Sequence, residues 1–358
     1  MKKIIILALI VLIQQGCANK PKIENKDLKI KLQPVAKHSV LGHEDYYVWG
    51  GSMVQSEDDV YNLFYSRWPK ESKFRGWLKQ SEVAHAVSNS PTGPYTFKSV
   101  ALTGVGEGNW NEEAAHNPHI KKFGDKYYLY FISHTTSDKD LSDWMNHIYG
   151  QRIGVAVSDS PNGPWEVSET PLIDYQEGKP AYGYMVNPSV CERPDGTYLM
   201  MFKARKKDSE KSNRFDPIHC LATAPTPTGP FTIAEQTLLT EHTAEDPFVW
   251  MQNDTYYAIV KDMHGKYTGV KSLALFESAN GIDWGPSKNL LISKTEITWE
   301  DNTVLPLRSL ERPQVWFDKD GNPSVLFCAA GKKGNRNKEN TFNVQIPIKI
   351  EWTEKIDE

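Results

Sequence analysis

The sequence predicts an all-β protein, because one short phrase returns five times along the chain and each copy is followed by a turn and an aromatic strand. The copies are spaced by roughly 60 to 70 residues, and this period together with this strand content is typical of radial blades. We therefore expect a five-bladed β-propeller with its ligand site on the central axis. The copies occupy residues 49–54, 116–120, 186–190, 245–249 and 311–315.

Four of the copies place a polar or charged residue directly before a proline, as Asn117 stands before Pro118. If the copies are the inner strands of blades, these residues all face one pocket. The outer part of a blade repeats too, as a strand, a turn rich in proline and glycine, and an aromatic return strand. These outer repeats lie at residues 84–95, 154–165, 221–231 and 278–284. No amphipathic helix longer than a few turns is expected.

Both ends of the expected propeller alternate like strands. Residues 341–350 follow the fifth blade, and residues 28–32 lie near the start. Pairing one or both of them into the last blade would cover edges that are otherwise open. We expect one domain, at residues 28–358.

Residues 1–27 precede that domain. Lys2 and Lys3 come before the apolar residues 4–13, which are too few to span a bilayer. The following Gly16 and Cys17 complete the pattern of a bacterial lipoprotein signal. We expect a signal peptide at residues 1–16, lipidation of Cys17 and a tether at residues 17–27. The protein would then be lipid-anchored in the cell envelope, facing the periplasm or at the outer-membrane surface; simple cleaved secretion is the alternative.

The composition narrows the choice of partners. The formal net charge is −4, with acidic and basic residues interspersed, so no nucleic acid is expected to bind. The 11 Trp and 16 Tyr residues favour sugars, whose flat apolar faces stack on aromatic rings. Neither a disulfide framework nor a metal or other cofactor is expected from the remaining cysteines, and the protein is expected to be a monomer. Candidate sugar contacts near the rim are Trp49, Trp68, Trp110 and Trp144.

The phrase Glu-Asp-Pro-Phe-Val at residues 245–249 and the Ser-Pro-x-Gly-Pro-aromatic turns resemble the five-bladed propellers of glycoside hydrolase families 43, 32 and 117. The resemblance covers nearly all of the expected mature chain, and it implies the propeller fold and a carbohydrate ligand. In family 43 it also implies an Asp base in the first blade, an Asp that tunes pKa in the second and a Glu acid in the third. This chain departs at all three places, which hold Gly50-Gly51, His116-Asn117 and Val186-Asn187.

Two chemistries suit the remaining residues, and the first is elimination on a uronic acid. Arg312, Arg205, Asn117 or Asn187 could neutralise the carboxylate next to the proton that leaves. His116 could act as the base, with His264 or Glu245 as the acid. The leaving group would be water in a dehydratase or a sugar in a polysaccharide lyase, and the product an unsaturated uronic acid. The substrate would be the non-reducing end of an anionic oligosaccharide, such as a sulfated algal glycan of the ulvan type.

The second chemistry is hydrolysis by relocated carboxylates. Glu311 with Asp246 or Glu245 could flank a glycosidic bond at the separation that an inverting enzyme needs. By resemblance, family 117 implies that a His can serve as the acid in this fold. Elimination is favoured here, because hydrolysis in this fold relies on the first-blade base that this chain lacks. A third reading, a glycan-binding propeller without catalysis, is disfavoured because so many titratable groups gather at one pocket.

The resulting candidates share a place near the inner ends of the blades. Two segments without strand periodicity, residues 69–80 and 135–150, are expected to close the pocket so that it takes a chain end. His116 and His119 are expected on opposite faces of their strand, and His85 and His219 are expected to be packing residues. The catalytic candidates are His116, Glu245, Asp246, His264 and Glu311; the substrate-binding candidates are Trp49, Arg67, Asn117, His134, Asn187, Lys203, Arg205 and Arg312.

Overall fold

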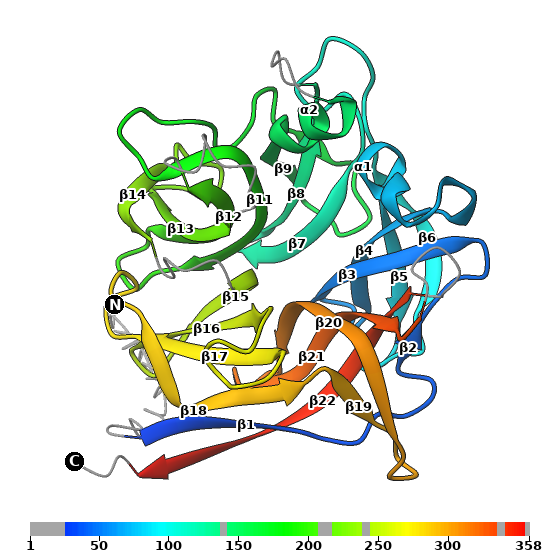
Figure 1. The fold of residues 1–358 in the computed structure, drawn as a ribbon, viewed down its shortest axis with the longest axis vertical. Coiled ribbons are helices and arrows are strands. Elements are labelled where there is room, and N and C mark those ends of the chain that lie inside the picture. The colour runs from blue at the N-terminus through cyan, green and yellow to red at the C-terminus, as the bar shows by residue number, and fades with distance from the viewer. Residues whose placement is uncertain (1–25, 137–141, 207–216, 238–243, 335–340, 355–358) are drawn as a thin grey trace, which may run out of the picture.

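The computed structural model describes residues 26–136, 142–206, 217–237, 244–334 and 341–354. Within them the chain forms five antiparallel sheets arranged around one axis, which confirms the five-bladed propeller (Figure 1). The predicted signal peptide, Cys17 and all but the last two residues of the predicted tether lie outside the described residues. No helix in the described part of the chain is both long enough and apolar enough to cross a membrane.

Blades one to four are four-stranded meanders whose first strand lies nearest the axis, and the fifth blade carries extra strands. The strands of blade one are β3 (Tyr46–Gln55), β4 (Tyr61–Pro69), β5 (Glu82–Ser88) and β6 (Thr96–Leu102). Blade two has β7 (His116–Phe123), β8 (Lys126–His134), β9 (Gln151–Ser158) and β10 (Glu166–Val167). Blade three has β11 (Ala181–Glu192), β12 (Tyr198–Lys206), β13 (Pro217–Ala224) and β14 (Thr232–Thr237). Blade four has β15 (Ala244–Gln252), β16 (Thr255–Asp262), β17 (Ser272–Ser278) and β18 (Gly285–Lys294).

The fifth blade is built from both ends of the described chain. Its strands are β19 (Glu296–Thr298), β20 (Val304–Phe317), β21 (Pro323–Lys332), β22 (Thr341–Glu354) and β1 (Lys26–Leu32), with β2 (Val40–Leu41) also paired to β22. Strand β1 runs antiparallel to β22 from the pair Lys26–Glu354 to the pair Leu32–Ile348. The prediction that terminal strands close the last blade is therefore confirmed, and both of them do so.

The core consists of separate apolar layers between adjacent blades. Phe248 and Trp250 of blade four, for example, pack with Leu326 and Val344 of blade five. Serine side chains on the inner strands add polar links from blade to blade. The Ser52 hydroxyl accepts a hydrogen bond from the backbone N–H of Ile120 at 3.0 Å. The apolar layers between the blades and these serine hydrogen bonds together hold the inner strands around the axis.

Every inner strand carries a β-bulge at the repeated phrase. The register shifts fall between Trp49 and Ser52 in β3 and at the four corresponding places in the other blades. One bulge residue in each blade has a left-handed backbone conformation, with φ between 50° and 58°. Glycine, Asn and Asp adopt this conformation most readily, whereas Arg does so rarely. These residues are Gly50, Asn117, Asn187, Asp246 and Arg312.

The bulge changes the register between His116 and His119, which were expected on opposite faces of their strand. His116 is opposite Ile132, and His119 is opposite Tyr130. Three steps along β7 therefore match two steps along β8, because the bulge inserts one extra residue. The two imidazoles still have separate surroundings: His116 contacts Trp77 and Ser81 beside blade one, whereas the His119 Nδ1 atom is 2.6 Å from the Gln314 Oε1 atom of blade five.

Candidate active site

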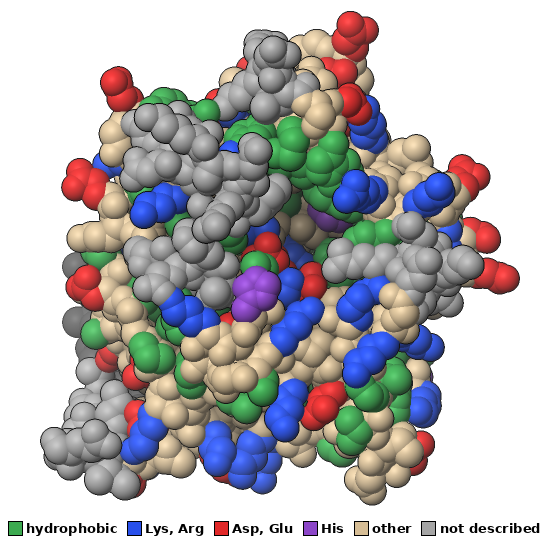
Figure 2. Space-filling model, in the orientation of Figure 1, with side chains coloured by type: hydrophobic (Ala, Val, Ile, Leu, Met, Phe, Trp, Pro, Cys, Tyr) green, Lys and Arg blue, Asp and Glu red, His purple; other side chains and the backbone are tan. Residues whose placement is uncertain are grey.

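A pocket of about 370 Å³ lies at one end of the propeller axis and receives side chains from all five blades. Figure 2 shows it as a hollow near the centre of the face, with acidic and basic side chains inside it. The residue directly before the left-handed bulge residue lines this pocket in every blade. These five residues are Trp49, His116, Val186, Glu245 and Glu311.

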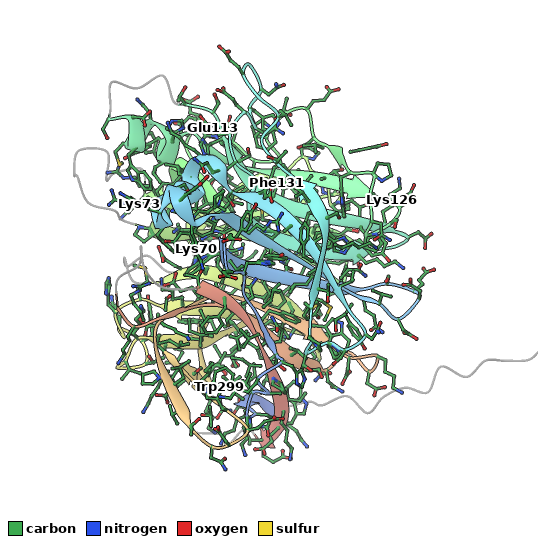
Figure 3. All side chains as sticks on the ribbon, turned by 90° about the vertical axis from the view of Figure 1, so that its right-hand side faces the viewer. Lys70, Lys73, Glu113, Lys126, Phe131 and Trp299 are labelled. Atoms are coloured by element: carbon green, nitrogen blue, oxygen red, sulfur yellow. The ribbon has the colours of Figure 1, made fainter. Side chains whose placement is uncertain are left out.

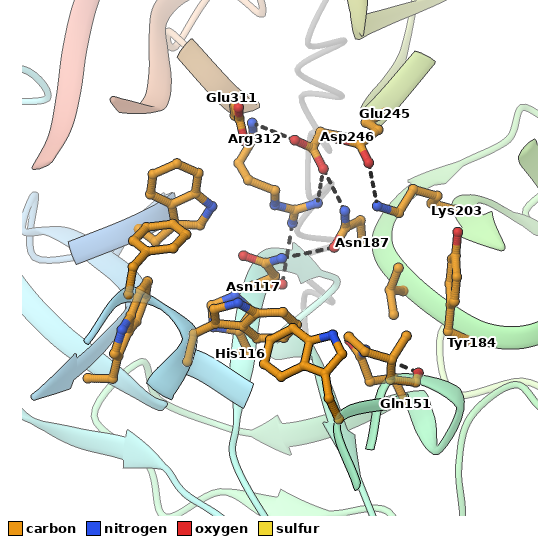
Figure 4. Close-up of a pocket in the computed structure, with 17 residues that line it drawn as sticks. His116, Asn117, Gln151, Tyr184, Asn187, Lys203, Glu245, Asp246, Glu311 and Arg312 are labelled. Carbon is orange, nitrogen blue, oxygen red and sulfur yellow. Dashed lines mark hydrogen bonds and ion pairs between the residues drawn. The ribbon is translucent and has the colours of Figure 1, made fainter. Parts of the chain in front are cut away.

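Four of the five bulge residues form the floor of the pocket, joined side by side across the blades (Figure 4). The Asn117 Nδ2 atom donates to the Asn187 Oδ1 atom at 2.9 Å, and the Asn187 Nδ2 atom donates to the Asp246 Oδ1 atom at 2.5 Å. The other oxygen of Asp246 accepts a bond from the backbone N–H of Arg312 at 3.2 Å. The Arg312 guanidinium reaches back to donate to the Asn117 carbonyl at 3.3 Å. Both oxygens of Asp246 are thus engaged in holding the floor together.

One wall of the pocket is a charged cluster. The Glu245 carboxylate receives the Lys203 ammonium at 2.8 Å and the Lys261 ammonium at 3.0 Å. Lys261 also contacts the Glu311 carboxylate at 2.9 Å, so it bridges blades four and five. Burial opposes ionisation of Glu245, but the two ammonium groups outweigh it and hold the pKa of this carboxyl well below its usual range. Glu245 is therefore an ionised carboxylate at neutral pH.

The opposite wall is aromatic. It holds Phe74 and Trp77 from the segment after β4, together with Trp144 from the helix α2 (Asp143–Tyr149). The Trp77 and Trp144 rings meet edge to face at 6.0 Å, and Lys79 pairs with Asp143 at 3.2 Å. The described parts of the two segments expected to close the pocket, residues 69–80 and 135–150, therefore meet one another beside it. The remaining aromatic lining residues are Trp49, Trp68 and Tyr184.

His116 joins the floor to this aromatic wall. Its ring stacks on Trp77, with ring centroids 4.9 Å apart, and its Nδ1 atom lies 2.8 Å from the Ser81 hydroxyl oxygen. Burial, helped by the Arg312 charge, lowers the pKa of His116 to about 3. The imidazole is therefore neutral at physiological pH, as a base would need to be and as a general acid would not.

Four of the sequence-derived candidates do not line the pocket. Arg67 pairs with Glu82 at 2.7 Å on the outer side of β4, because neighbours on a strand point to opposite faces and Trp68 takes the inner one. Arg205 lies over the Tyr149 ring, farther along β12 than the pocket-lining Lys203. His134 is buried against the Leu78 carbonyl, and His264 lies exposed in the segment after β16. The candidates that do come together are Trp49, His116, Asn117, Asn187, Lys203, Glu245, Asp246, Glu311 and Arg312.

Several lining residues were not found from the sequence. Phe74, Trp77 and Ile148 lie in the two closing segments, which were expected at the pocket without individual residues being named. Trp110, a candidate sugar contact, instead packs on Phe131 and donates to the Ser168 carbonyl at 3.0 Å. Among the described residues, no group of three or more His, Cys, Asp or Glu side chains is already arranged to hold a metal ion. The other lining residues missed were Gln151, Tyr184 and Val186.

No protein-family model and no curated protein sequence matches this chain. Solved structures do match along nearly the whole length. A family 117 glycoside hydrolase from the marine bacterium Zobellia galactanivorans aligns over 94% of each chain with a TM-score of 0.62 and 15% identity. An endo-arabinase from Bacteroides thetaiotaomicron covers 89% of this chain and 98% of its own, with a TM-score of 0.56 and 13% identity. The fold is that of these glycoside hydrolases.

A family 43 β-xylosidase/α-arabinofuranosidase from a compost metagenome, solved with xylotriose, is similar as well. It covers 87% of this chain and 94% of its own, with a TM-score of 0.55 and 16% identity. The resemblance to families 43 and 117 is thus confirmed for the architecture. At these low identities the similarity concerns the fold, and the chemistry has to be argued from the pocket.

Proposed function

We propose that the protein is a carbohydrate-active enzyme that hydrolyses a glycosidic bond at the end of an oligosaccharide. The observation that carries the proposal is the shared ammonium of Lys261, which contacts Glu245 at 3.0 Å and Glu311 at 2.9 Å opposite the aromatic wall. Two carboxylates on neighbouring blades thus face one cavity beside a surface suited to the flat face of a sugar. In this proposal Glu245 and Glu311 replace the first-blade base, which the resemblance to family 43 implies and this chain lacks.

The size and cover of the pocket support action at a chain end. Its volume of about 370 Å³ lies at the lower end of the range for small-molecule sites. The segments that carry Trp77 and Trp144 meet over one side of it. A terminal sugar would stack on the aromatic wall while its hydroxyls reach the Asn117 and Asn187 amides on the floor.

The charges in the pocket favour an uncharged terminal sugar. Lys203 and Arg312 are the cations that line the described pocket, and Lys261 contacts two of its carboxylates; each of the three lies within 4 Å of a carboxylate. The carboxylates that line the pocket, Glu245, Asp246 and Glu311, outnumber its two lining cations and are matched in number only when Lys261 is included. An anionic substrate would need positive charge in excess, and the described lining residues supply none.

The two carboxylates have different surroundings, which suggests different roles. Glu245 is held ionised by two ammonium groups, and we assign it to activate water as the general base. Glu311 contacts one ammonium through one oxygen, and we assign it to protonate the departing sugar oxygen, for which it takes up a proton from solvent before each turnover. Asp246 positions Asn187 and Arg312 and takes no part in proton transfer in this scheme.

The test is to incubate the purified protein with neutral and uronate-containing oligosaccharides and follow the products by mass spectrometry. Hydrolysis gives shorter chains that have gained one water. Glu311→Gln should lose most activity on natural sugars and keep much of it on glycosides with good leaving groups, because these need no acid. Glu245→Gln should be inactive on both kinds of substrate. Glu57→Gln, which changes an exposed carboxylate in the turn after β3, is the matched control.

Elimination on a uronic acid is the second candidate, and the neutral imidazole of His116 is the observation that favours it. The same incubation separates the two chemistries. Ultraviolet absorbance from a conjugated enoate, lost in His116→Gln, would support elimination and remove the roles given to Glu245 and Glu311. Chain cleavage with added water and no absorbance would remove the role of His116 as base.

A further inference from the structure

Two buried histidines lie behind the aromatic wall, outside the pocket. His134 ends strand β8 and His147 lies in helix α2, and each is only 2% exposed. Their Nδ1 atoms face one another at 3.4 Å. Neither residue takes part in the chemistry proposed above.

The contacts of the other ring nitrogens fix which atoms carry hydrogen. The Nε2 atom of His134 contacts the Leu78 carbonyl oxygen, which can only accept, so this nitrogen is the donor. The Nε2 atom of His147 lies 3.3 Å from the Asp143 carboxylate, which also only accepts. In a neutral imidazole the opposite nitrogen is then a bare acceptor. If both rings are neutral, two lone pairs face each other, and either a proton on one ring or a bound cation would remove this conflict.

The separation of the two Nδ1 atoms suits a shared metal ion and is long for a hydrogen bond. An N–H···O hydrogen bond spans about 2.7–3.2 Å, so a contact of 3.4 Å between two nitrogens is at the long end for a hydrogen bond. Two nitrogens bound to one tetrahedral zinc ion, each at about 2.0–2.1 Å from it, lie about 3.4 Å apart. The observed 3.4 Å matches the second arrangement. Outer contacts from Nε2 to a carbonyl and a carboxylate are also those that metal-bound histidines ordinarily make.

A third ligand is close. The Glu113 carboxylate has an oxygen 3.9 Å from the Nδ1 atom of His147, and its side chain is 24% exposed. This oxygen would have to move to complete the site, because no three such side chains of the described residues are arranged to hold a metal ion as they lie. Figure 3 shows Glu113 on the same side of the molecule as Lys70 and Lys73 of the first closing segment. We propose that His134 and His147, with Glu113 as third ligand, bind a divalent transition-metal ion of the zinc class.

The position of this site gives the ion a structural role. His134 contacts Leu78, which follows Trp77 directly, and His147 shares helix α2 with Trp144. An ion between the two rings would fasten α2 to β8 and to the segment that carries Trp77. It would thus hold both halves of the aromatic wall together.

The test uses the purified protein without a histidine tag and Zn²⁺ as the probe. Titration calorimetry should show one Zn²⁺ per chain, and anomalous diffraction at the zinc edge should place it between the two Nδ1 atoms. His147→Ala and His134→Gln should abolish this binding. Asp143→Asn, at a side chain that is 77% exposed, should weaken it by about 10- to 100-fold through the loss of an outer contact. His38→Ala, at an exposed histidine, is the control and should bind normally.

Three results would overturn the proposal: no stoichiometric Zn²⁺ in the unaltered protein, equal binding by His147→Ala, or an anomalous peak elsewhere. Circular dichroism would show whether the histidine variants fold. If they do not, the exposed Asp143→Asn variant decides, because an unchanged affinity there contradicts the arrangement. Activity plays no part in these measurements, so their outcome is independent of the proposed hydrolysis.

Discussion

Arg312 occupies the space next to Gly50 at the propeller axis. A Cβ atom built on Gly50 would lie 3.6 Å from the Arg312 Cγ atom and 3.0 Å from the Asn117 Oδ1 atom. The first blade therefore has no side chain at its bulge, and the fifth blade supplies a long one there. The first blade thus has no carboxylate at its bulge, and the buried Arg312 side chain of the fifth blade packs against the glycine that stands there.

Gly50→Ala should destabilise the fold through both backbone and contact. Its φ of +53° is unfavourable for a residue with a Cβ by about 1–2 kcal/mol, and the close Asn117 oxygen adds to this. Gly124→Ala is the matched control, because Gly124 has a φ of +57° and nothing within 4 Å of the added atom. Urea denaturation should show the larger loss for Gly50→Ala. Equal losses would mean that the space beside Arg312 is not tight.

Arg312→Met should be strongly destabilising, because Asp246 would remain buried without its cation. Removing one member of a buried ion pair costs about 3–5 kcal/mol. The double variant Arg312→Met/Asp246→Asn should lose less than the two single variants added together, since no unpaired charge is left. Urea denaturation of the four proteins measures this coupling. Strict additivity would show that Arg312 and Asp246 are not energetically paired.

His219 should make the fold sensitive to acid. It is fully buried, neither ring nitrogen has a hydrogen-bond partner among the described residues, and burial lowers its pKa to about 3 from 6.5. Because the folded pKa is depressed, the unfolded chain binds the extra proton first. The stabilisation is complete above pH 6.5 and is lost as the pH falls towards about 3.

His219→Leu should therefore reduce the stability lost between pH 7 and pH 5, as measured by urea denaturation at both values. His38→Leu, at an exposed histidine, should leave that difference as it is in the unaltered protein. A difference that stays the same in His219→Leu would show that this histidine takes up no proton on unfolding in that range.

Trp77→Ala should weaken sugar binding. Loss of one stacking ring removes about 0.5–1.5 kcal/mol beyond the buried area, which is about 2- to 10-fold in affinity. Calorimetry with an oligosaccharide in the Glu311→Gln background would measure binding without turnover. Tyr175→Ala, at an aromatic side chain that is 46% exposed, should leave the affinity unchanged. Unchanged binding by Trp77→Ala would remove the aromatic wall from the proposed site.

The repeated phrase predicted the architecture well because each copy carries both a strand and its bulge residue. It also predicted that Asn187, Asp246 and Arg312 share one pocket, although they lie far apart in the sequence, and all three line it. What the phrase does not reveal is the bulge itself, which shifts the register between His116 and His119. One extra residue reverses the direction of every side chain counted past it.

The candidates that lie elsewhere share another cause. Arg67 was grouped with Trp68 because the two are neighbours, yet only one of two neighbours on a strand can face the axis. His264 follows β16 in a segment with no periodicity from which its direction could be argued. Phe74 and Trp77 could not be predicted to line the pocket for the same reason, because they lie in short helical turns whose side-chain directions the sequence pattern does not give. The signal peptide and the lipidation of Cys17 remain predictions.

The pairing of β1 with β22 gives the fold a closed connectivity. Lys26 lies opposite Glu354, and the two side chains form an ion pair at 3.1 Å. A short peptide could join these two positions, and the chain could be cut instead at the tight turn between Phe123 and Lys126. Such a circular permutant would keep every sheet. The pairing of the strands does not depend on which of them comes first in the sequence.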